Sequence, residues 1–550
     1  MCGIFSILNA NNVTYNFIND EFIKGKNRGP EYSKLLQLDN NYFGFHRLAI
    51  NGLNEKSNQP FNINNMILIC NGEIYNYKNL YNLMEIIPET NSDCEVIIHL
   101  YVKYGIEQTL QMLDGVFAFI LYDTVNNQIF AARDPYGVRP LYQLFKTTDL
   151  DCDPLIGFAS ELKCLSEFNN LNKSYSIKQF TPGTYSSFSY TNKGWVNNEQ
   201  NIHYFMPSFS CSCSSDKLEW SSYFDNIVNY LTNSVEKRCL TTERPIACLL
   251  SGGLDSSLIT AIVNEYYKCK FTNKKLETYS IGLAGSEDLK YARIVANYLK
   301  TNHTEIIVTE KEMFDAIPEV IHAIESYDTT SVRASIGNYL LGKYISKNSD
   351  AKVIFNGDGS DEISGGYLYM RSCPDSIEFD KETRRLLKDI HLFDVLRSDK
   401  CISSHGLEPR TPFLDRNFVN YYLSISPYAR NYSNFSQCEK FLIRKSFSFP
   451  LFENSLGKQI LPDEILWRQK EAFSDGVTGH GRSLFQILQE FISVELNLPA
   501  NIETEKLYYK TIFEGFYPNM SHILPYFWMP KYTKATDPSA RTLSVYNSDK

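Results

Sequence analysis

Several signatures of common protein classes are missing from this sequence of 550 residues. It has no Walker A motif, no G-x-G-x-x-G, no paired C-x-x-C motif and no H-E-x-x-H, which excludes two frequent nucleotide-binding loops and the familiar zinc sites. No apolar run approaches the ~18 residues of a membrane span, and no secretory signal pattern begins the chain. The 13 cysteines are scattered and odd in number, so a disulfide framework is not indicated. We therefore expect a cytoplasmic protein in a reducing compartment.

Positive charge is also scarce. The chain has 54 Lys and Arg against 63 Asp and Glu, a net charge of -9 and a pI near 5.6. This balance argues against nucleic acid or an acidic membrane as a partner, and any anion site must be built locally. At about 150 residues per domain, the length indicates more than one domain.

The densest motif is a Ser-Gly loop that follows a strand-like run at 245–248 and precedes an apolar-periodic segment at 258–263. Its residues are Leu249, Ser251, Gly252, Gly253, Asp255, Ser256 and Ser257. Glycines at a helix N-terminus let backbone N–H groups approach an anion, and the hydroxyls add donors. Asp255 suits phosphates only if a divalent cation bridges them. An ordinary Gly-Ser turn is the alternative. The loop resembles the pyrophosphate-binding loop of the ATP pyrophosphatase (PP-loop) family, which splits ATP between its α and β phosphates.

A second acidic loop occurs where strands and helices alternate. We expect strands at 278–282, 303–308 and 352–355 and a helix at 289–299. Such alternation predicts a doubly wound parallel sheet with ligands at the carboxyl ends of its strands. Asn356, Gly357, Asp358 and Asp361 follow the last strand, so Asp361 could converge with Asp255 on one Mg²⁺. A solvated acidic turn or a calcium loop is the alternative, although the EF-hand spacing is missing.

The N-terminus carries a candidate nucleophile. Removal of Met1 would leave Cys2 with a free α-amino group beside its thiol. The reference pKa values are about 7.7 to 8.0 for the amine and about 8.5 for the thiol, so one group can act as a base for the other. A Met-Cys start without supporting residues would carry no such meaning.

Supporting residues follow in order: Arg28-Gly29-Pro30-Glu31, His46-Arg47-Leu48-Ala49-Ile50, Asn71-Gly72-Glu73-Ile74-Tyr75-Asn76 and Ser92-Asp93-Cys94-Glu95. With the start at Met1 they resemble the N-terminal-nucleophile (Ntn) glutaminase domain of class II amidotransferases. The resemblance implies an αββα sandwich, to which strand-like runs at 66–70, 115–123 and 128–132 are suited. It also implies an oxyanion hole at Asn71 and Gly72 that stabilises the tetrahedral intermediate. The implied glutamine-binding residues are Arg47, Leu48, Ile50, Asn71, Glu73 and Asp93. The family more often has Asp where this chain has Glu31.

These patterns divide the chain into a glutaminase domain at 2–203, a linker at 204–222 and a synthetase domain at 223–550. The linker is rich in Ser and lacks sustained periodicity. Cys211 and Cys213 within it lack partner ligands in sequence, so a solvated connector is favoured over a metal site.

Along its whole length the chain resembles the glutamine-hydrolysing asparagine synthetases. The specific motifs are the Ser-Gly loop, the acidic loop with Gly365-Gly366-Tyr367, and the segments 327–335, 409–415 and 467–476. The resemblance implies that glutamine, aspartate and ATP are the substrates. β-Aspartyl-AMP would form with release of pyrophosphate. Ammonia released from glutamine would reach this intermediate through an apolar passage between the domains and convert it to asparagine.

The same resemblance implies roles for individual residues. Lys470 would stabilise charge at the α-phosphate, Asp358 would act near the attacking ammonia, and Leu249 and Ile281 would flank the adenine. Asn356 and Gly357 join the Ser-Gly loop in binding ATP. Aspartate would be bound by Thr330, Ser331 and Arg333, and Mg²⁺ by Asp255 and Asp361. The sequence leaves a homodimer open.

Two alternatives remain beside asparagine synthesis. One is adenylation of another acceptor, as in β-lactam synthetases, which lack the glutaminase Cys that is present here as Cys2. The other is a non-catalytic binder of nucleotide or glutamine. Their support comes from departures at Asn356 and Asp358, where the family usually has Ser and Glu, and at Ser331, where it has Thr.

Overall fold

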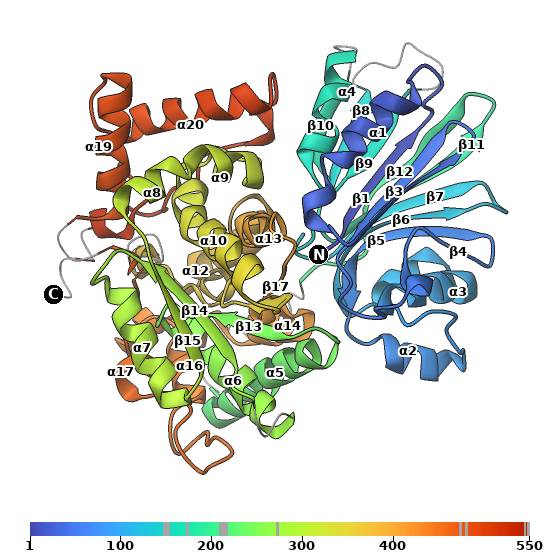
Figure 1. The fold of residues 1–550 in the computed structure, drawn as a ribbon. Helices are drawn as coiled ribbons and strands as arrows, with labels where there is room; N and C mark the ends of the chain where they lie inside the picture. The colour runs from blue at the N-terminus through green and yellow to red at the C-terminus, as the bar shows by residue number, and fades with distance from the viewer. Residues whose placement is uncertain are drawn as a thin grey trace.

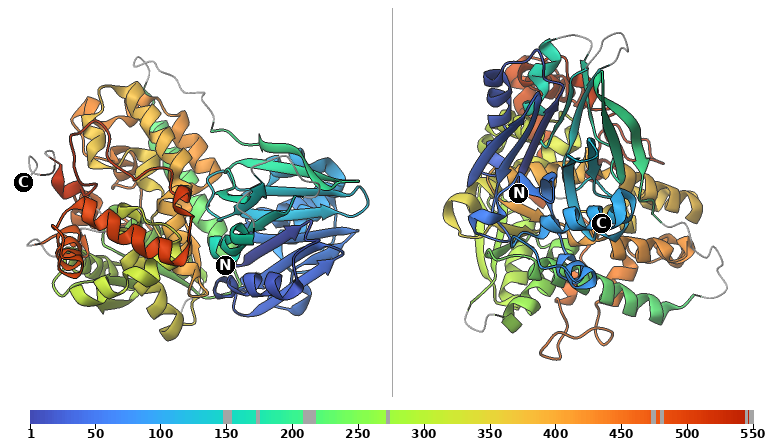
Figure 2. Two further views of the ribbon diagram at one scale, coloured as in Figure 1. Left: turned by 90° about the horizontal axis from the view of Figure 1, so that it is seen from above. Right: turned by 90° about the vertical axis from the view of Figure 1, so that its right-hand side faces the viewer.

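The computed structural model describes residues 1–146, 154–171, 175–207, 218–270, 274–471, 476–478, 482–543 and 546. Two halves lie side by side, the N-terminal half in blue to cyan and the C-terminal half in green to red (Figure 1). The N-terminus lies between them. The views in Figure 2 confirm this arrangement. The start of the chain is therefore positioned where it can serve both halves.

The N-terminal half contains two stacked antiparallel sheets of six strands. The first has the order β10-β8-β9-β1-β3-β2, with β1 Gly3–Leu8, β2 Tyr32–Leu38, β3 Asn41–Arg47, β8 Tyr142–Lys146, β9 Ile156–Ala159 and β10 Tyr175–Gln179. The second has the order β12-β11-β7-β6-β5-β4, with β4 Phe61–Ile63, β5 Met66–Ile74, β6 Gly115–Asp123, β7 Gln128–Arg133, β11 Thr184–Thr191 and β12 Gly194–His203.

Helices cover both outer faces of this pair of sheets. One face carries α1 (Tyr15–Ile23) and α4 (Ser166–Leu171), and the other carries α2 (Tyr77–Met84) and α3 (Val96–Met112) (Figure 1). Strand β1 shows why the outer face of its sheet needs helices to cover it. Alternate side chains of a strand point to opposite faces, and in β1 both faces are apolar. Ile4 and Leu8 join the core between the sheets, whereas Phe5 and Ile7 pack with residues of α1 and α4. The expected αββα sandwich is confirmed.

The predicted strands of this half agree with β5, β6 and β7, although β5 runs four residues further than expected. The extension contains Asn71 and Gly72, a pair that in isolation is typical of a hairpin turn. Here their pairing with Ala118 and Phe117 of β6 keeps the backbone extended. Tertiary pairing therefore overrides the local turn preference.

The C-terminal half is built on a parallel sheet of five strands with the order β15-β14-β13-β16-β17. The strands are β13 Ile246–Leu249, β14 Glu277–Gly282, β15 Asn302–Ile307, β16 Val353–Phe355 and β17 Glu408–Arg410. The α-helices are α5 Trp220–Leu240, α6 Leu254–Lys270, α7 Glu287–Leu299, α8 Glu310–Asp315, α9 Ile317–Ile324, α10 Thr329–Asn348, α11 Ser360–Ser364, α12 Ser376–Asp389, α13 Asp394–Ser403, α14 Arg416–Ser424, α15 Pro427–Arg430, α16 Phe441–Ser446, α17 Asp463–Leu466, α19 Leu484–Leu496 and α20 Ile502–Phe516.

Helices pack on both faces of this sheet, as a doubly wound fold requires. Ile246 and Cys248 of β13 pack in one cluster with residues of α5 and α6, whereas Ala247 and Leu249 pack in another with residues of α10. Figure 1 shows α5 and α6 on one side of the sheet and α10 and α13 on the other. The predicted parallel sheet is confirmed, and its expected strands and helix α7 agree with the structure to within two residues. Helix α6 begins four residues before the apolar-periodic segment at 258–263.

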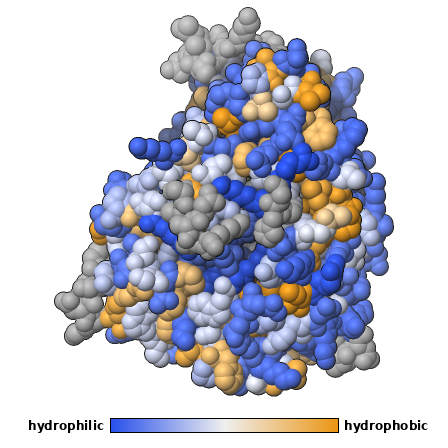
Figure 3. All heavy atoms as spheres, turned by 90° about the vertical axis from the view of Figure 1, so that its left-hand side faces the viewer, coloured by the Kyte–Doolittle hydropathy of each residue, from blue (hydrophilic) through white to orange (hydrophobic). Residues whose placement is uncertain are grey.

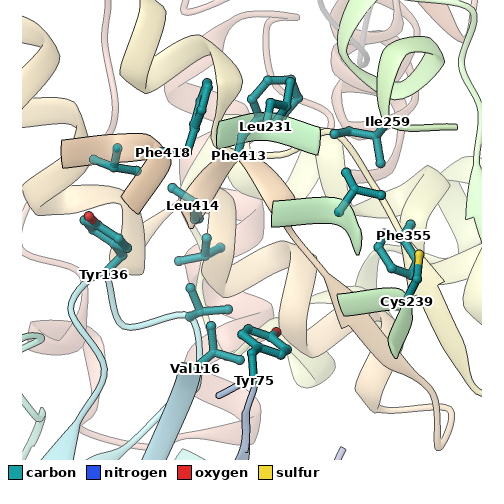
Figure 4. Packing of buried hydrophobic residues seen from close by; sticks show 14 of the residues in the cluster. Tyr75, Val116, Tyr136, Leu231, Cys239, Ile259, Phe355, Phe413, Leu414 and Phe418 are labelled. Carbon is teal, nitrogen blue, oxygen red and sulfur yellow. The ribbon is translucent and has the colours of Figure 1, made fainter. Parts of the chain in front are cut away.

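The two halves share a hydrophobic cluster. Tyr75 and Val116 of the N-terminal half lie near Leu414 of the C-terminal half, and Figure 4 shows these side chains in the cluster. This apolar contact helps to hold the halves in one relative position.

The segment 204–222 is only partly described. Tyr204 and Phe205 at its start are buried, and α5 begins at Trp220. Cys211 and Cys213 lie outside the described residues, so the connector and its boundaries stay a prediction.

The surface offers no membrane-spanning element among the described helices, since none is both long and apolar enough to cross a bilayer. On the face that carries α7 and α19, apolar side chains are scattered in small groups among hydrophilic ones (Figure 3).

Candidate functional sites

Cys2 lies directly before β1, at the contact between the two halves. Its Sγ donates to the Leu48 carbonyl at 3.7 Å, and its own carbonyl accepts from Arg28 Nε at 2.9 Å. Burial raises the pKa of the Cys2 thiol, while the nearby N-terminal amine and Arg47 oppose that rise. The thiol therefore needs a base or a neighbouring cation to become a nucleophile.

The free α-amino group, which could serve as this base, is on Met1 in this structure and not on Cys2. Met1 is buried, and burial lowers the pKa of its amine to about 6. The nitrogen lies 3.9 Å from the Glu408 carboxylate of the other half. A free amine on Cys2 requires removal of Met1, and this expectation stays a prediction.

Asn71 and Gly72 face the start of β1 through Ser160. The Ser160 hydroxyl accepts from Ile4 N at 3.1 Å and from Asn71 Nδ2 at 3.5 Å. The Asn71 Oδ1 is buried and has no hydrogen-bond partner among the described residues. A Cβ on Gly72 would lie 2.6 Å from the Val116 carbonyl, so only glycine fits there. Ser160 thus links Asn71 to Ile4, which lies two residues after Cys2.

Arg47 ends β3 beside the segment 51–58. Its guanidinium donates to the Asn54 carbonyl at 3.0 Å and to Asn58 Oδ1 at 2.6 Å. These acceptors are neutral, so they orient the guanidinium without neutralising it. Leu48 and Ile50, which follow it in the chain, are buried. The Asn51 carbonyl at 3.2 Å and the Gly52 carbonyl also accept from Arg47 Nη2, so a bound carboxylate would have to replace some of these acceptors.

Glu73 and Asp93 form a buried pair of carboxylates. Glu73 Oε2 accepts from Asn51 Nδ2 at 2.7 Å, and Asp93 Oδ2 accepts from Ile74 N at 2.7 Å. Burial raises the pKa of Asp93 to about 6. Burial and Asp93 together raise the pKa of Glu73 well above its usual value. A cationic ligand between them would favour the ionised forms of both.

The second site is a cavity of about 200 Å³ in the C-terminal half. It lies beyond the carboxyl ends of β13, β14 and β16, where a doubly wound sheet binds its ligands. Most of the predicted residues line it: Leu249, Ser251, Gly253, Asp255, Ser256, Ile281, Thr330, Ser331, Asn356, Gly357, Asp358, Asp361 and Lys470. Gly252, Ser257 and Arg333 do not line it.

The Ser-Gly loop is held by its own hydroxyls. Ser256 Oγ accepts from Ser251 N at 3.2 Å and lies 3.0 Å from Ser251 Oγ. Gly252 has φ +76°, and a Cβ there would lie 2.4 Å from Ala292 N. This glycine therefore lets the loop turn against α7 and direct the N-terminus of α6 into the cavity.

Two lysines bridge the predicted metal ligands. Lys440 Nζ lies 2.5 Å from Asp255 Oδ2 and 2.7 Å from Asp361 Oδ1. Lys470 Nζ lies 2.6 Å from Asp361 Oδ2. Lys440 and Lys470 lower the pKa of Asp361, despite its burial. Asp255 and Asp361 thus lie on either side of the Lys440 ammonium group, and their binding of Mg²⁺ stays a prediction.

The residues fit Mg²⁺ in part. Asp255 Oδ1 is buried without a hydrogen-bond partner among the described residues. Within the same part of the chain no group of three or more His, Cys, Asp or Glu side chains gathers. Two carboxylates suit Mg²⁺, which usually keeps waters and takes phosphate oxygens as further ligands.

Asp358 faces a buried arginine that the sequence did not indicate. Asp358 Oδ1 accepts from Arg397 Nη2 at 3.3 Å, and its Oδ2 is buried with no partner among the described residues. Burial raises the pKa of Asp358, and Arg397 opposes the rise. Asn356 lies beneath, donating to Ser398 Oγ at 2.7 Å. One carboxylate oxygen thus remains available to a ligand.

The structure places Arg333 outside the cavity. Its guanidinium donates to Glu505 at 2.8 and 2.5 Å and to Asp537 at 2.8 Å from each of two nitrogens. Its positive charge is therefore satisfied by two buried carboxylates that join α10 to α20 and the C-terminal segment. The sequence predicted that Arg333 binds aspartate. These contacts instead support a structural role for Arg333.

We expect Arg333→Met to act on stability. Removing one member of a buried ion cluster typically costs about 3–5 kcal/mol, because it leaves uncompensated charge. The loss in the free energy of unfolding would be measured by urea unfolding. Lys343→Met on the same helix is the control, because its exposed pair with Glu319 contributes at most about 1 kcal/mol. A raised KM for aspartate with unchanged unfolding would instead support the binding role.

Several cavity residues were missed by sequence reasoning, among them Lys440, Arg397 and Trp528. Lys440 lies directly before α16, Arg397 in α13, and Trp528 beyond α20, and no local pattern links them to the loops. The segment 472–475 of the motif at 467–476 lies outside the described residues. Only the fold brings these side chains to the cavity.

Both halves of the chain are similar in sequence to known protein families. The glutamine amidotransferase domain family matches residues 1–224, and the asparagine synthase family matches residues 226–379 and 372–535. The chain is 40% identical over 580 residues to "Asparagine synthetase [glutamine-hydrolyzing]" of Cricetulus griseus and 39% identical over 580 residues to the protein of the same name from Homo sapiens. Each match covers 100% of this chain and 99% of the relative.

Proposed function

Since the chain belongs to the family of glutamine-hydrolysing asparagine synthetases and carries out glutamine-dependent asparagine synthesis, we propose how its residues divide that reaction. The domain at 2–203 releases ammonia from glutamine, and the domain at 223–550 activates aspartate with ATP. The linker at 204–222 joins them. The observation that carries this division is the meeting of Asp255, Asp361, Lys440 and Lys470 in one cavity, away from Cys2.

Glutamine is hydrolysed at Cys2. The thiolate attacks the amide carbonyl, and Asn71 Nδ2 with the Gly72 N–H stabilises the oxyanion that forms. The amide nitrogen leaves as ammonia, and water then cleaves the thioester to release glutamate. Arg47 binds the α-carboxylate, while Glu73 and Asp93 bind the α-ammonium group.

Aspartate is activated in the cavity. Its side-chain carboxylate attacks the α-phosphorus of ATP, and pyrophosphate leaves. Lys470 and Lys440 stabilise the negative charge on the phosphates, and the N-terminus of α6 with Ser251 and Ser256 binds the pyrophosphate. Mg²⁺, held by Asp255 and Asp361, would neutralise phosphate charge in this step. Leu249 and Ile281 supply an apolar wall for the adenine.

Arg397 is the cation that we assign to the aspartate α-carboxylate, with Thr330 as a second donor. Arg397 is bound to Asp394 at 2.6 Å and to Asp358 at 3.3 Å, and it lines the cavity. The Thr330 hydroxyl is buried without a partner among the described residues. A substrate carboxylate would satisfy both groups.

Asp358 is the base that we propose for the second step. Ammonia attacks the acyl carbon of β-aspartyl-AMP, Asp358 accepts the proton, and AMP leaves to give asparagine. Its free Oδ2 is the oxygen for this role. The side chain is shorter than the Glu usual in the family. Asn356 Oδ1 accepts from Asp358 N at 3.3 Å, and Gly357 packs closely against the backbone of Asp255 and Ser256 in the Ser-Gly loop.

We expect Asp358→Ala to form the adenylate but little asparagine. Loss of a general base typically lowers a rate by about 10² to 10⁴. Asparagine, pyrophosphate and glutamate would be measured together, with Asp358→Glu as the matched control that keeps the charge. Near-normal asparagine output from Asp358→Ala would show that Asp358 is structural.

Transfer of nitrogen within the protein can be tested directly. The enzyme would receive aspartate, ATP and amide-¹⁵N glutamine in the presence of unlabelled ammonium. We expect ¹⁵N-enriched asparagine, with AMP and pyrophosphate in equal amounts. Asparagine whose label matches the bulk ammonium pool would contradict direct transfer. The apolar lining of a passage stays a prediction.

We also propose a cytoplasmic location, which is supported by the free state of all the described cysteines. Homodimer formation stays a prediction.

A further inference from the structure

The C-terminal half reaches into the glutamine site at several points. Gly52 N donates to Glu243 Oε1 at 2.6 Å, and Arg244 Nε donates to the Ala49 carbonyl at 2.8 Å. Both contacts hold the segment 49–52, which connects Arg47 to the rest of the N-terminal half. The walls of the glutamine site are therefore not supplied by one half alone.

Arg410 makes the most direct of these contacts. It ends β17 of the C-terminal half and is 1% exposed. Its Nη2 lies 3.3 Å from Glu73 Oε2, the same oxygen that accepts from Asn51. The guanidinium also contacts Glu408 at 2.8 Å and donates to the Thr241 carbonyl at 2.7 Å. Arg410 is thus fixed within its own half and reaches Glu73 in the other.

The charges around Glu73 show what this contact does. Asp93 and Glu408 face Glu73 with like charge, and Arg410 and Arg139 face it with opposite charge. Burial, Asp93 and Glu408 raise the pKa of Glu73, and Arg410 is the larger of the two opposing influences. Even with Arg410 in place the pKa of Glu73 lies well above its usual value, so removing Arg410 would favour the neutral form of Glu73 further.

We propose that Arg410 is a positioning residue for glutamine, which holds the Glu73 carboxylate through its contact at 3.3 Å so that Glu73 can bind the α-ammonium group. The C-terminal half thereby completes the glutamine site. This inference rests on the proposed role of Glu73 in binding glutamine. Arg410 does not touch the substrate in this account, because it acts through Glu73.

The test is the pH dependence of kcat/KM for glutamine hydrolysis by the full-length enzyme. An ionised Glu73 is lost as pH falls through its pKa, so kcat/KM has an acid limb. Removing a cation raises the pKa of a neighbouring carboxyl by about 1 to 3 units. We expect Arg410→Met to move the acid limb upward by about 1 unit or more and to raise KM for glutamine roughly 10-fold near neutral pH. Synthesis from ammonium salts should keep its rate.

Two variants serve as controls. Arg410→Lys retains a positive charge and should keep the acid limb near that of the wild type. Arg238→Met removes another buried arginine of the same half, which pairs with Asp415 and makes no contact with Glu73, and it should not move the limb. If Arg410→Met does not fold, Arg410→Gln compared with Arg410→Lys makes the same comparison of neutral and charged side chains.

Glu73→Gln separates failure of this inference from failure of the proposed function. An unchanged KM for glutamine in Glu73→Gln would show that Glu73 does not bind glutamine. A raised KM in Glu73→Gln, together with an unmoved acid limb in folded Arg410→Met, would overturn the role of Arg410 alone. In the Glu73→Gln background, Arg410→Met should raise KM no further.

Discussion

Cys2→Ala is expected to abolish glutamine-dependent asparagine synthesis and to retain synthesis from ammonium salts. Glutamine hydrolysis at Cys2 only releases ammonia. The groups proposed to activate aspartate, namely Asp255, Asp361, Lys440 and Lys470, lie in the separate cavity. Without the nucleophile no thioester can form, so the loss should be at least about 10³-fold. Asparagine would be measured with glutamine and then with ammonium chloride as the nitrogen source.

Cys269→Ala is the matched control, because Cys269 is a free and exposed thiol in the other half. It should retain both activities. If Cys2→Ala lost both activities while its unfolding transition stayed that of the wild type, the assignment of two separate sites would be wrong.

The second large effect is expected for Asp361→Asn. Asp361 binds Lys440 and Lys470 at 2.7 and 2.6 Å, and it is the proposed partner of Asp255 in holding Mg²⁺. A divalent ion contributes several kcal/mol of charge stabilisation at a phosphoryl group. We therefore expect formation of AMP and pyrophosphate to fall by about 10³-fold, while glutamine hydrolysis at Cys2 stays nearly unchanged.

Binding of Mn²⁺, followed by electron paramagnetic resonance in the presence of ATP, gives a readout besides activity and should weaken in the same variant. Asp315→Asn, which alters an exposed pair with Lys311, is the control and should change neither quantity. Equal loss of AMP formation and glutamine hydrolysis in Asp361→Asn, at unchanged stability, would count against the assignment.

Lys440 gives this prediction a further consequence. Its ammonium group lies between the two carboxylates that are proposed to hold Mg²⁺, so metal binding requires it to move. The natural new partner is a phosphate oxygen, because a buried ammonium group must keep an opposite charge nearby. The same side chain would therefore hold the two acidic loops together before ATP binds and hold ATP afterwards.

The sequence alone determined the parts of the molecule that depend on local patterns. The alternation at 278–355 was sufficient to predict the parallel sheet, and the family resemblance carried by the motifs near Cys2 implied the αββα sandwich. In each case the information is contiguous, because periodicity, glycine positions and strand ends are written in short segments.

The tertiary structure decided what depends on long-range contact. Arg333 belongs to a motif of the synthetase half, yet Glu505 and Asp537, far away in the chain, turn it into a buried anchor. Asn71 and Gly72 are extended only because β6 pairs with them. Neither outcome can be derived from the neighbouring residues, since the partner that decides it comes from a remote segment.

The same reason explains Lys440, Arg397 and Arg410, none of which stands in a pattern that indicates its contacts. Short motifs specify which backbone loops form an anion site, whereas the charges that complete the site come from wherever the fold places a cation. For this protein the sequence predicted the two folds, and most of the loop residues that it singled out in the C-terminal half line the cavity. Only the tertiary structure decided which buried charges face them, because electrostatic contact depends on distance in space and not on separation along the chain.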